Sequence, residues 1–208
     1  MSSLTLVAIS DIHNDYSMEI PDGDVFIFAG DISYIGEIKD LIRFNEWLGD
    51  LPHKHKLYIP GNHDIIFESS TPLAKEIVSN GTYLYGNKSI NINGKTFFGS
   101  PYTPTFGKWA FMMDEDARIH HWSTIPVVDV LVTHGPPKNI LDANRAGEPC
   151  GCSWLAYEIS NRIKPQAHIF GHIHEGFGST VIGETSYYNV SHMNRDYSPT
   201  NGATIINI

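Results

Sequence analysis

Short apolar runs that end abruptly in polar residues recur along the chain. They occupy Leu4–Ile9, Asp24–Ala29, Leu57–Ile59, Val127–Val132 and Ala167–Phe170. Because apolar residues occupy both faces of each run, the pattern predicts strands of a sheet that is covered on both sides.

Between these runs, apolar residues follow helical spacing. One helix is predicted over Glu37–Leu48, closed by Gly49. A second begins at Thr71-Pro72, because Pro fits the first helical position, and Asn80-Gly81 predicts its end. Further helices are predicted at Met113–His121 and from a cap at Ser153 to the residue before Pro165.

Elsewhere strands follow one another without helices, which predicts antiparallel pairing. These strands are Tyr83–Tyr85, Ser89–Ile92 and Lys95–Phe98, with a hairpin turn at Asn93-Gly94. A loop rich in Pro, Gly and aromatic residues is predicted at 99–110, and closing strands at Tyr187–Ser191 and Ala203–Ile208. With no repeat or linker, we expect a single α/β domain over residues 1–208.

The charge balance narrows the classes of partner. The net charge is −9 with neutral histidines, which argues against broad binding to nucleic acid or anionic membranes. Met1–Ser10 has no basic residue before its short apolar run, so we expect no signal peptide or membrane anchor and a cytoplasmic protein. Cys150 and Cys152 are too few for a structural zinc site or a disulfide framework, and we expect both to be reduced.

Metal-binding side chains follow the predicted strands with unusual regularity. A single His or Asp after a strand is usually an ordinary turn residue, but the same kind of residue follows five strands here. Ligands bind beyond the carboxyl ends of strands in sheets of this kind, so these side chains should gather at one edge. In chain order they are Asp11 and His13, Asp31, Asn62 and His63, His134, and His172 and His174.

The mixture of nitrogen and oxygen ligands suits Mn, Fe, Zn, Ni or Co better than Ca or Mg. There are too many ligands for one tetrahedral ion, so two divalent ions roughly 3.5–4 Å apart fit better. His63 could protonate a leaving group, and Asp64 could orient the imidazole of His63. The other six histidines lack this context and are interpreted as surface or structural residues: His53, His55, His120, His121, His168 and His192.

These motifs resemble the five motifs of the calcineurin-like metallophosphoesterase superfamily. They are Asp11-x-His13, Gly30-Asp31, Gly61-Asn62-His63-Asp64, His134 and Gly171-His172-x-His174. The flanking sequence is most similar to the metallophosphoesterase-domain-containing group, through segments such as Thr133-His134-Gly135-Pro136-Pro137 and Arg162–Gly176. The resemblance implies a two-sheet β-sandwich flanked by helices.

It also implies roles for individual residues. Asp11, His13 and His174 would hold one metal ion, while Asn62, His134 and His172 would hold the second. Asp31 would bridge the two ions, and His63 and Asn62 would contact the substrate. The protein phosphatases of this superfamily carry an arginine after the second motif, and Gly30-Asp31-Ile32-Ser33-Tyr34-Ile35-Gly36 has none.

The function that follows is hydrolysis of small phosphodiesters by metal-activated hydroxide, with cyclic nucleotides the class favoured by resemblance. Four aromatic residues near the motifs could stack on a base or simply pack as a lid or core: Tyr102, Phe106, Trp109 and Phe177. Two alternatives stay open, a broad-specificity phosphomonoesterase and a non-catalytic metal-binding interaction module. The sequence leaves the oligomeric state open.

Overall fold

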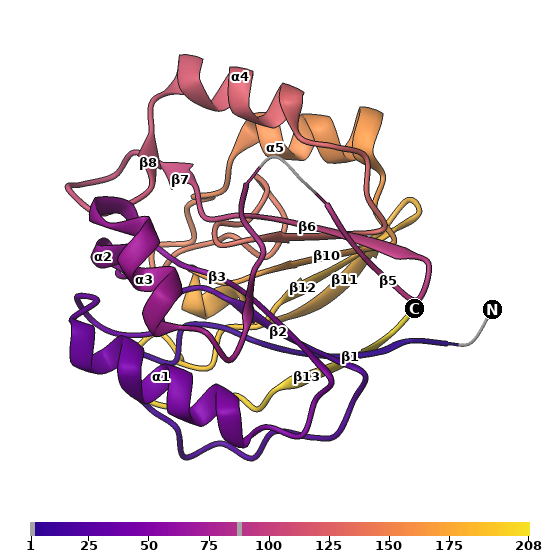
Figure 1. Ribbon diagram of the computed structural model, residues 1–208. Coiled ribbons are helices and arrows are strands. Elements are labelled where there is room, and N and C mark those ends of the chain that lie inside the picture. The colour runs from indigo at the N-terminus through magenta and orange to yellow at the C-terminus, as the bar shows by residue number, and fades with distance from the viewer. Residues whose placement is uncertain (1–2, 87–88) are drawn as a thin grey trace.

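The computed structural model describes residues 3–86 and 89–208, in which two sheets pack face to face with helices on both outer sides (Figure 1). The strands are β1 Thr5–Ile9, β2 Val25–Ala29, β3 His55–Ile59, β4 Thr82–Tyr83, β5 Ile90–Ile92, β6 Lys95–Ser100, β7 Thr103–Pro104, β8 Met112–Met113, β9 Val130–Thr133, β10 Ala167–Phe170, β11 Gly178–Ile182, β12 Thr185–Asn189 and β13 Thr204–Asn207. The helices are α1 Ile38–Asp50, α2 Ile65–Ser69, α3 Thr71–Ile77, α4 Glu115–Thr124 and α5 Ser153–Glu158. This arrangement confirms the predicted sandwich.

Parallel strands form the centre of the two large sheets, and three of their four edge strands run antiparallel to their neighbours. The first sheet has the order β13-β1-β2-β3-β4, and only β13 runs antiparallel to its neighbour. The second has the order β11-β12-β10-β9-β6-β5, with β11 and β5 antiparallel at its two edges. The carboxyl ends of the central strands of each sheet therefore share one side of that sheet.

Three apolar layers hold these elements together. Alternate residues of β1, β2 and β3 meet β6, β9 and β10 between the sheets, for example Ala8, Ile27, Phe97 and Val132. The opposite face of the first sheet packs on α1, α2 and α3, and that of the second on α4 and α5. Both faces of the central strands are thus buried, which explains their uninterrupted apolar sequences.

Several element boundaries differ from the sequence prediction for local reasons. The helix predicted at Met113–His121 begins at Glu115, because the Asp114 side chain accepts the Ala117 N–H at 2.9 Å and caps it. The helix from Thr71 ends at Ile77, before Asn80-Gly81. Instead of ending a helix, Asn80 bonds to Asn45 through its backbone N–H and its side chain.

Two further predictions needed correction. Cys152, not Ser153, occupies the cap position of α5, and a π-helical turn at Ile159–Ile163 completes this helix before Pro165. The antiparallel pairing predicted for consecutive strands holds for the β5–β6 hairpin, but β4 runs parallel to β3 in the other sheet. Helix α2 and strand β11 were not predicted.

Within residues 3–86 and 89–208, no helix combines the length and apolarity needed to cross a membrane. Met1 and Ser2, which belong to the N-terminal stretch where we expect no signal peptide, lie outside the described residues. Both cysteines are free thiols, with Cys152 buried and Cys150 partly exposed.

Candidate metal centre

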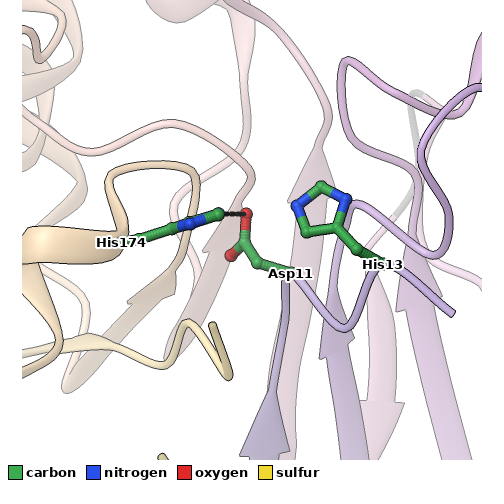
Figure 2. Close-up of side chains that lie close together, drawn as sticks. All are labelled: Asp11, His13 and His174. Carbon is green, nitrogen blue, oxygen red and sulfur yellow. Dashed lines mark ion pairs between the residues drawn. The ribbon is translucent and has the colours of Figure 1, made fainter. Parts of the chain in front are cut away.

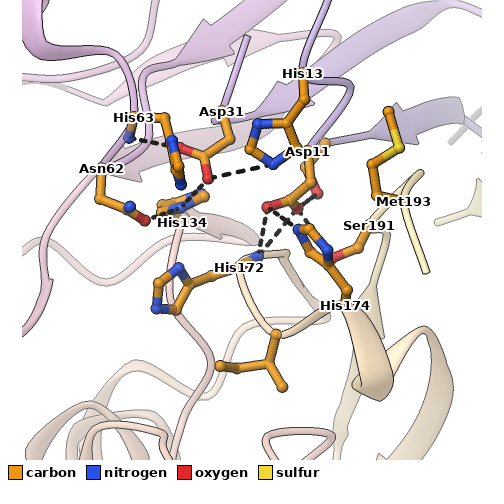
Figure 3. Close-up of polar contacts among 12 residues, drawn as sticks. Asp11, His13, Asp31, Asn62, His63, His134, His172, His174, Ser191 and Met193 are labelled. Atoms are coloured by element: carbon orange, nitrogen blue, oxygen red, sulfur yellow. Dashed lines mark hydrogen bonds and ion pairs between the residues drawn. The ribbon is translucent and has the colours of Figure 1, made fainter. Parts of the chain in front are cut away.

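The polar residues that follow the central strands meet where the two sheets adjoin (Figure 3). Backbone hydrogen bonds bring the loops together, from Asp11 N–H to the Gly30 carbonyl and from Gly171 N–H to the His134 carbonyl. The backbone N–H of His172, in the second sheet, donates to the carboxylate of Asp11, in the first. All seven predicted metal ligands and His63 therefore lie in one cluster. It contains three groups of residues, and within each group the potential ligand atoms lie within 4.8 Å of one another, while Asn62 lies beside His134.

The backbone is strained where these residues leave the strands. Asp11, His13, Asp31 and His172 have φ values of 52°, 42°, 60° and 70°, in the left-handed region that residues with a Cβ rarely adopt. Such conformations are retained where the surrounding structure enforces them, commonly at functional sites. Here they turn the side chains sharply from the strand ends toward a common point.

The first group of potential ligands comprises Asp11, His13 and His174, with the carboxylate between the two rings (Figure 2). The Nδ1 atoms of His13 and His174 lie 3.0 and 3.2 Å from the carbonyl oxygens of Ser33 and Asn194. Because a carbonyl oxygen only accepts, each Nδ1 carries the hydrogen and each Nε2 keeps its lone pair.

The surroundings of these Nε2 atoms fit a cation. Nε2 of His13 is buried and has no hydrogen-bond partner among the described residues. Nε2 of His174 lies 3.5 Å from Asp11 Oδ1. The other oxygen of Asp11 accepts from the hydroxyl groups of Ser10 and Ser191, so Oδ1, which accepts the His172 N–H, keeps a further lone pair for a metal.

The second group comprises Asp31, His134 and His172, with Asn62 beside it. Nδ1 of His134 donates to the carbonyl of Ala29 at 3.0 Å, so Nε2 is the nitrogen left for a proton or a metal ion. This Nε2 lies 2.9 Å from Asn62 Oδ1 and 3.4 Å from Asp31 Oδ2. Three electron-rich atoms facing one another need a proton or a metal ion between them.

Asp31 connects the two groups. Its Oδ2 lies 3.4 Å from Nε2 of His134 and 3.9 Å from Nε2 of His13, and the Asp31–His13 pair also forms a third possible ligand group with His63. Its other oxygen, Oδ1, accepts the backbone N–H of His63 at 2.9 Å. One Asp31 oxygen therefore faces ligands of both groups, which is the position a bridging carboxylate requires.

The electrostatics of the cluster favour bound cations. Burial alone would raise the pKa of Asp11 and Asp31, but contacts with His174 and His134 respectively hold both pKa values well below their usual range. Burial lowers the pKa of His134, yet Asp31 outweighs it and raises this pKa to about 9. Burial and the nearby charge of His134 lower the pKa of His172 to about 3. The site thus retains two carboxylates that attract positive charge.

His63 lies beside the two groups and faces a cavity. Its Nδ1 is 2.6 Å from the carbonyl of Tyr34, and its ring packs on Trp109 with centroids 4.3 Å apart. Asp64, which we predicted to orient this ring, does not hydrogen-bond to it among the described residues. The buried Asp64 carboxylate instead accepts backbone N–H groups of Asp31, Ile32 and Gly61 at 2.8–3.1 Å.

Asp64 thereby joins the loops that follow β2 and β3. Burial and the Asp31 carboxylate raise the pKa of Asp64 to about 7, although the Gly61 and Ile32 N–H groups act in the opposite direction. We assign Asp64 to the support of the Asp31 and Asn62 loops, because its hydrogen bonds run to their backbones.

The cavity in front of the cluster has a volume of about 550 Å³. Its lining includes Asp31, His63, Phe106 and Trp109, and no lysine or arginine of the described residues belongs to it. Tyr102 instead packs against other aromatic side chains, and Phe177 is exposed outside this lining.

Several residues of the site were not singled out from the sequence. Ser10 and Ser191 hold Asp11, and Tyr197 lines the cavity from a turn after β12. The Ser10 hydroxyl adjoins the Asp11 motif in sequence, but nothing in the local sequence indicates Ser191 or Tyr197. The six histidines left outside the site stay outside the three ligand groups of the described residues; His168, for example, is buried against Thr133.

Comparisons with known proteins agree with this geometry. The chain is 34% identical to human metallophosphoesterase domain-containing protein 1 over 97% of its length and 70% of the relative's. It is 36% identical to UPF0046 protein C25E10.12 of Caenorhabditis elegans, over 91% of this chain and 75% of the relative.

Among solved structures, TT1561 of Thermus thermophilus shares the fold, with a TM-score of 0.59 at 12% identity over 99% of both chains. The family model for calcineurin-like phosphoesterases matches residues 4–176, which include all five motifs. The chain therefore belongs to the calcineurin-like phosphoesterase family, whose members are metal-dependent phosphoester hydrolases.

Proposed function

We propose that this protein is a dinuclear-metal-dependent phosphodiesterase that hydrolyses small phosphodiesters. The single observation that carries the proposal is the pair of ligand groups sharing Asp31 beside one cavity. Asp11, His13 and His174 would hold one ion, Asn62, His134 and His172 the other, and Asp31 both. Mn²⁺ is the ion we expect, with Fe, Zn, Ni or Co as alternatives that suit the same nitrogen and oxygen donors.

When bound, two divalent cations supply an activated water and positive charge for the phosphoryl oxygens. The residues of the chain would hold these ions and orient the ligands. Asp31 and Asp11 would supply the negative charge that attracts the cations. The carbonyl groups of Ser33, Ala29 and Asn194 would hold the imidazoles of His13, His134 and His174 in one tautomer.

His63 is the residue we propose to protonate the leaving oxygen. Its Nδ1 contacts the Tyr34 carbonyl, so Nε2 is the nitrogen left to face the substrate. Asn62, the preceding residue, combines a metal contact with a substrate contact in this proposal. Trp109 packs on the His63 ring in a tilted arrangement.

The charge of the cavity favours diesters over monoesters. A phosphomonoester carries nearly two negative charges at neutral pH and a diester carries one. The described cavity lining holds no lysine or arginine, and the sequence after Gly30-Asp31 lacks the arginine of the protein phosphatases. The two metal ions would therefore be the main positive charges available, which suits a singly charged substrate.

We further propose cyclic nucleotides as the favoured diesters and the cytoplasm as the location of the protein. Phe106 and Trp109 line the cavity and are 55% and 36% exposed, so part of each ring is accessible to a base, although Trp109 also packs on His63. Aromatic faces bind bases of any kind by stacking. This feature supports a nucleotide substrate without selecting one base.

The test is a paired assay after the metal is stripped and Mn²⁺ is restored. It compares hydrolysis of bis(p-nitrophenyl) phosphate with that of p-nitrophenyl phosphate, in wild type, His63→Ala and Asp31→Asn. The proposal expects metal-dependent turnover that is faster for the diester and is lost in both variants. Faster turnover of the monoester would favour the phosphomonoesterase, and binding of two ions without turnover would favour the interaction module.

A further inference from the structure

The turn at residues 194–198, between β12 and β13, holds Tyr197 in a conformation that bulky residues rarely adopt. Its φ is 58°, in the left-handed region where Gly or Asn fits with less strain. Asn194 enforces this turn: its Oδ1 accepts from the N–H groups of Asp196 and Ser198, and its carbonyl accepts from Tyr197 N–H. A strained residue held by several hydrogen bonds points to a role for its side chain.

The same turn supports the proposed metal centre. The Asn194 carbonyl that accepts from Tyr197 N–H also contacts Nδ1 of His174 at 3.2 Å. The Tyr197 ring lies against two proposed ligands of the first metal ion, with centroids 4.7 Å from His174 and 5.2 Å from His13. Tyr197 is therefore placed by the backbone group that orients His174.

Core packing does not account for this side chain. Tyr197 is 47% exposed and forms part of the cavity wall together with Asp31 and His63. Its hydroxyl has no hydrogen-bond partner within residues 3–86 and 89–208. An accessible, unpaired donor thus lies on the wall of a cavity whose described lining has no lysine or arginine.

We propose that Tyr197 binds the phosphoryl group of the substrate, with its hydroxyl donating a hydrogen bond to a non-bridging phosphoryl oxygen. This inference rests on the proposed function. A phenol donates without adding positive charge, whereas a guanidinium in its place would favour the second negative charge of a monoester. Tyr197 would therefore contribute to selection of singly charged diesters.

Tyr197→Phe tests the inference, because it removes the hydroxyl and keeps the ring. Tyr157→Phe is the matched control, since Tyr157 is a 55% exposed tyrosine of α5 outside the cavity lining. The measurements on the Mn²⁺-loaded proteins are the Kd of inorganic phosphate and kcat/KM for bis(p-nitrophenyl) phosphate, with Mn²⁺ affinity determined separately by calorimetry.

Loss of a hydrogen bond to a charged oxygen should weaken phosphate binding and lower kcat/KM by about tenfold each in Tyr197→Phe. Mn²⁺ affinity should remain unchanged, and Tyr157→Phe should match wild type. Unchanged phosphate affinity in Tyr197→Phe would overturn the inference, and so would a parallel loss of Mn²⁺ affinity, which would make the role structural.

The phosphate measurement separates this inference from the proposed function. If wild type binds phosphate but does not hydrolyse diesters, the proposed function fails and the two Kd values still decide the role of Tyr197. If wild type hydrolyses diesters and Tyr197→Phe matches it in both measurements, the function stands and the inference fails. Absence of phosphate binding to loaded wild type would overturn the inference, while diester turnover would still decide the proposed function.

Discussion

Replacing Asp64 with asparagine tests whether this carboxylate supports the loops of the site or orients His63. The carboxylate accepts the backbone N–H groups of Gly61 at 2.8 Å, Ile32 at 3.0 Å and Asp31 at 3.1 Å, and it is fully buried. Asparagine has nearly the same shape but only one acceptor oxygen, so it must turn its NH₂ group toward at least one of these donors.

The magnitude follows from the number of donors affected. A buried group left without its hydrogen bond costs about 1–3 kcal/mol, and a bond to a charged acceptor contributes about 1.5–3 kcal/mol. Because one or two of three such bonds are lost, we expect Asp64→Asn to lower the free energy of unfolding by about 2–4 kcal/mol. For a chain of 208 residues, a loss of about 3 kcal/mol corresponds to a fall in Tm of roughly 6–12 °C.

The assay is urea unfolding followed by circular dichroism in EDTA. His63→Ala is the comparison, because the partly buried His63 ring should contribute less than Asp64 to stability. Asp64→Asn with wild-type stability, but with the same loss of diester turnover as His63→Ala, would refute this reasoning and return Asp64 to an orienting role.

Three further outcomes are expected. Gly171→Ala should weaken Mn²⁺ binding at least tenfold by calorimetry, because a Cβ there would overlap the Asp11 carboxylate and the Ser10 hydroxyl, whereas Gly202→Ala meets nothing within 4 Å and should match wild type. Burial lowers the pKa of His168 from 6.5 to about 3. The contribution of His168 to the free energy of unfolding is therefore complete above pH 6.5 and falls by about 1.4 kcal/mol per pH unit below it. Unfolding measured between about pH 5 and 7 should show a shallower pH dependence for His168→Asn than for wild type, and an unchanged slope would contradict this. Mn²⁺ at 100 times its Kd should raise the free energy of unfolding by about 2.7 kcal/mol for one site, and EDTA should reverse this increase. A Tm that changes with neither Mn²⁺ nor EDTA would argue against specific binding.

The strand ends carried most of the information about the site. Each central strand is apolar on both faces and stops at a polar residue, so the sequence marks the carboxyl edge of the sheet directly. The convergence of Asp11, Asp31 and His134 follows from that pattern together with the parallel order of the strands. Predicting the ligand groups did not require the exact register of either sheet.

Contacts between segments that are distant in the sequence could not be predicted in the same way. Ser191 reaches Asp11 only because the chain bridges residues 10 and 191 across the two sheets. Tyr197 reaches His174 through a turn whose shape depends on Asn194, and no periodic pattern precedes it. Asp64 was assigned to its sequence neighbour His63, whereas the fold places backbone N–H groups from another loop closer to it.

Strand β4 illustrates a related limit. Thr82–Tyr83 lies between a helix and a hairpin, so the local sequence does not determine which sheet it joins. Packing of Tyr83 on Tyr58 and Phe67 favours the first sheet. The short strand therefore pairs with β3, and its direction is set by tertiary contacts.

The central claim is that one shared carboxylate, Asp31, holds two metal ions, and anomalous diffraction from Mn²⁺-soaked crystals tests it most directly. The account predicts two anomalous peaks roughly 3.5–4 Å apart, one beside Asp11, His13 and His174 and the other beside Asn62, His134 and His172, with Asp31 contacting both. A single peak, or Mn²⁺ bound only elsewhere on the chain, would contradict the account.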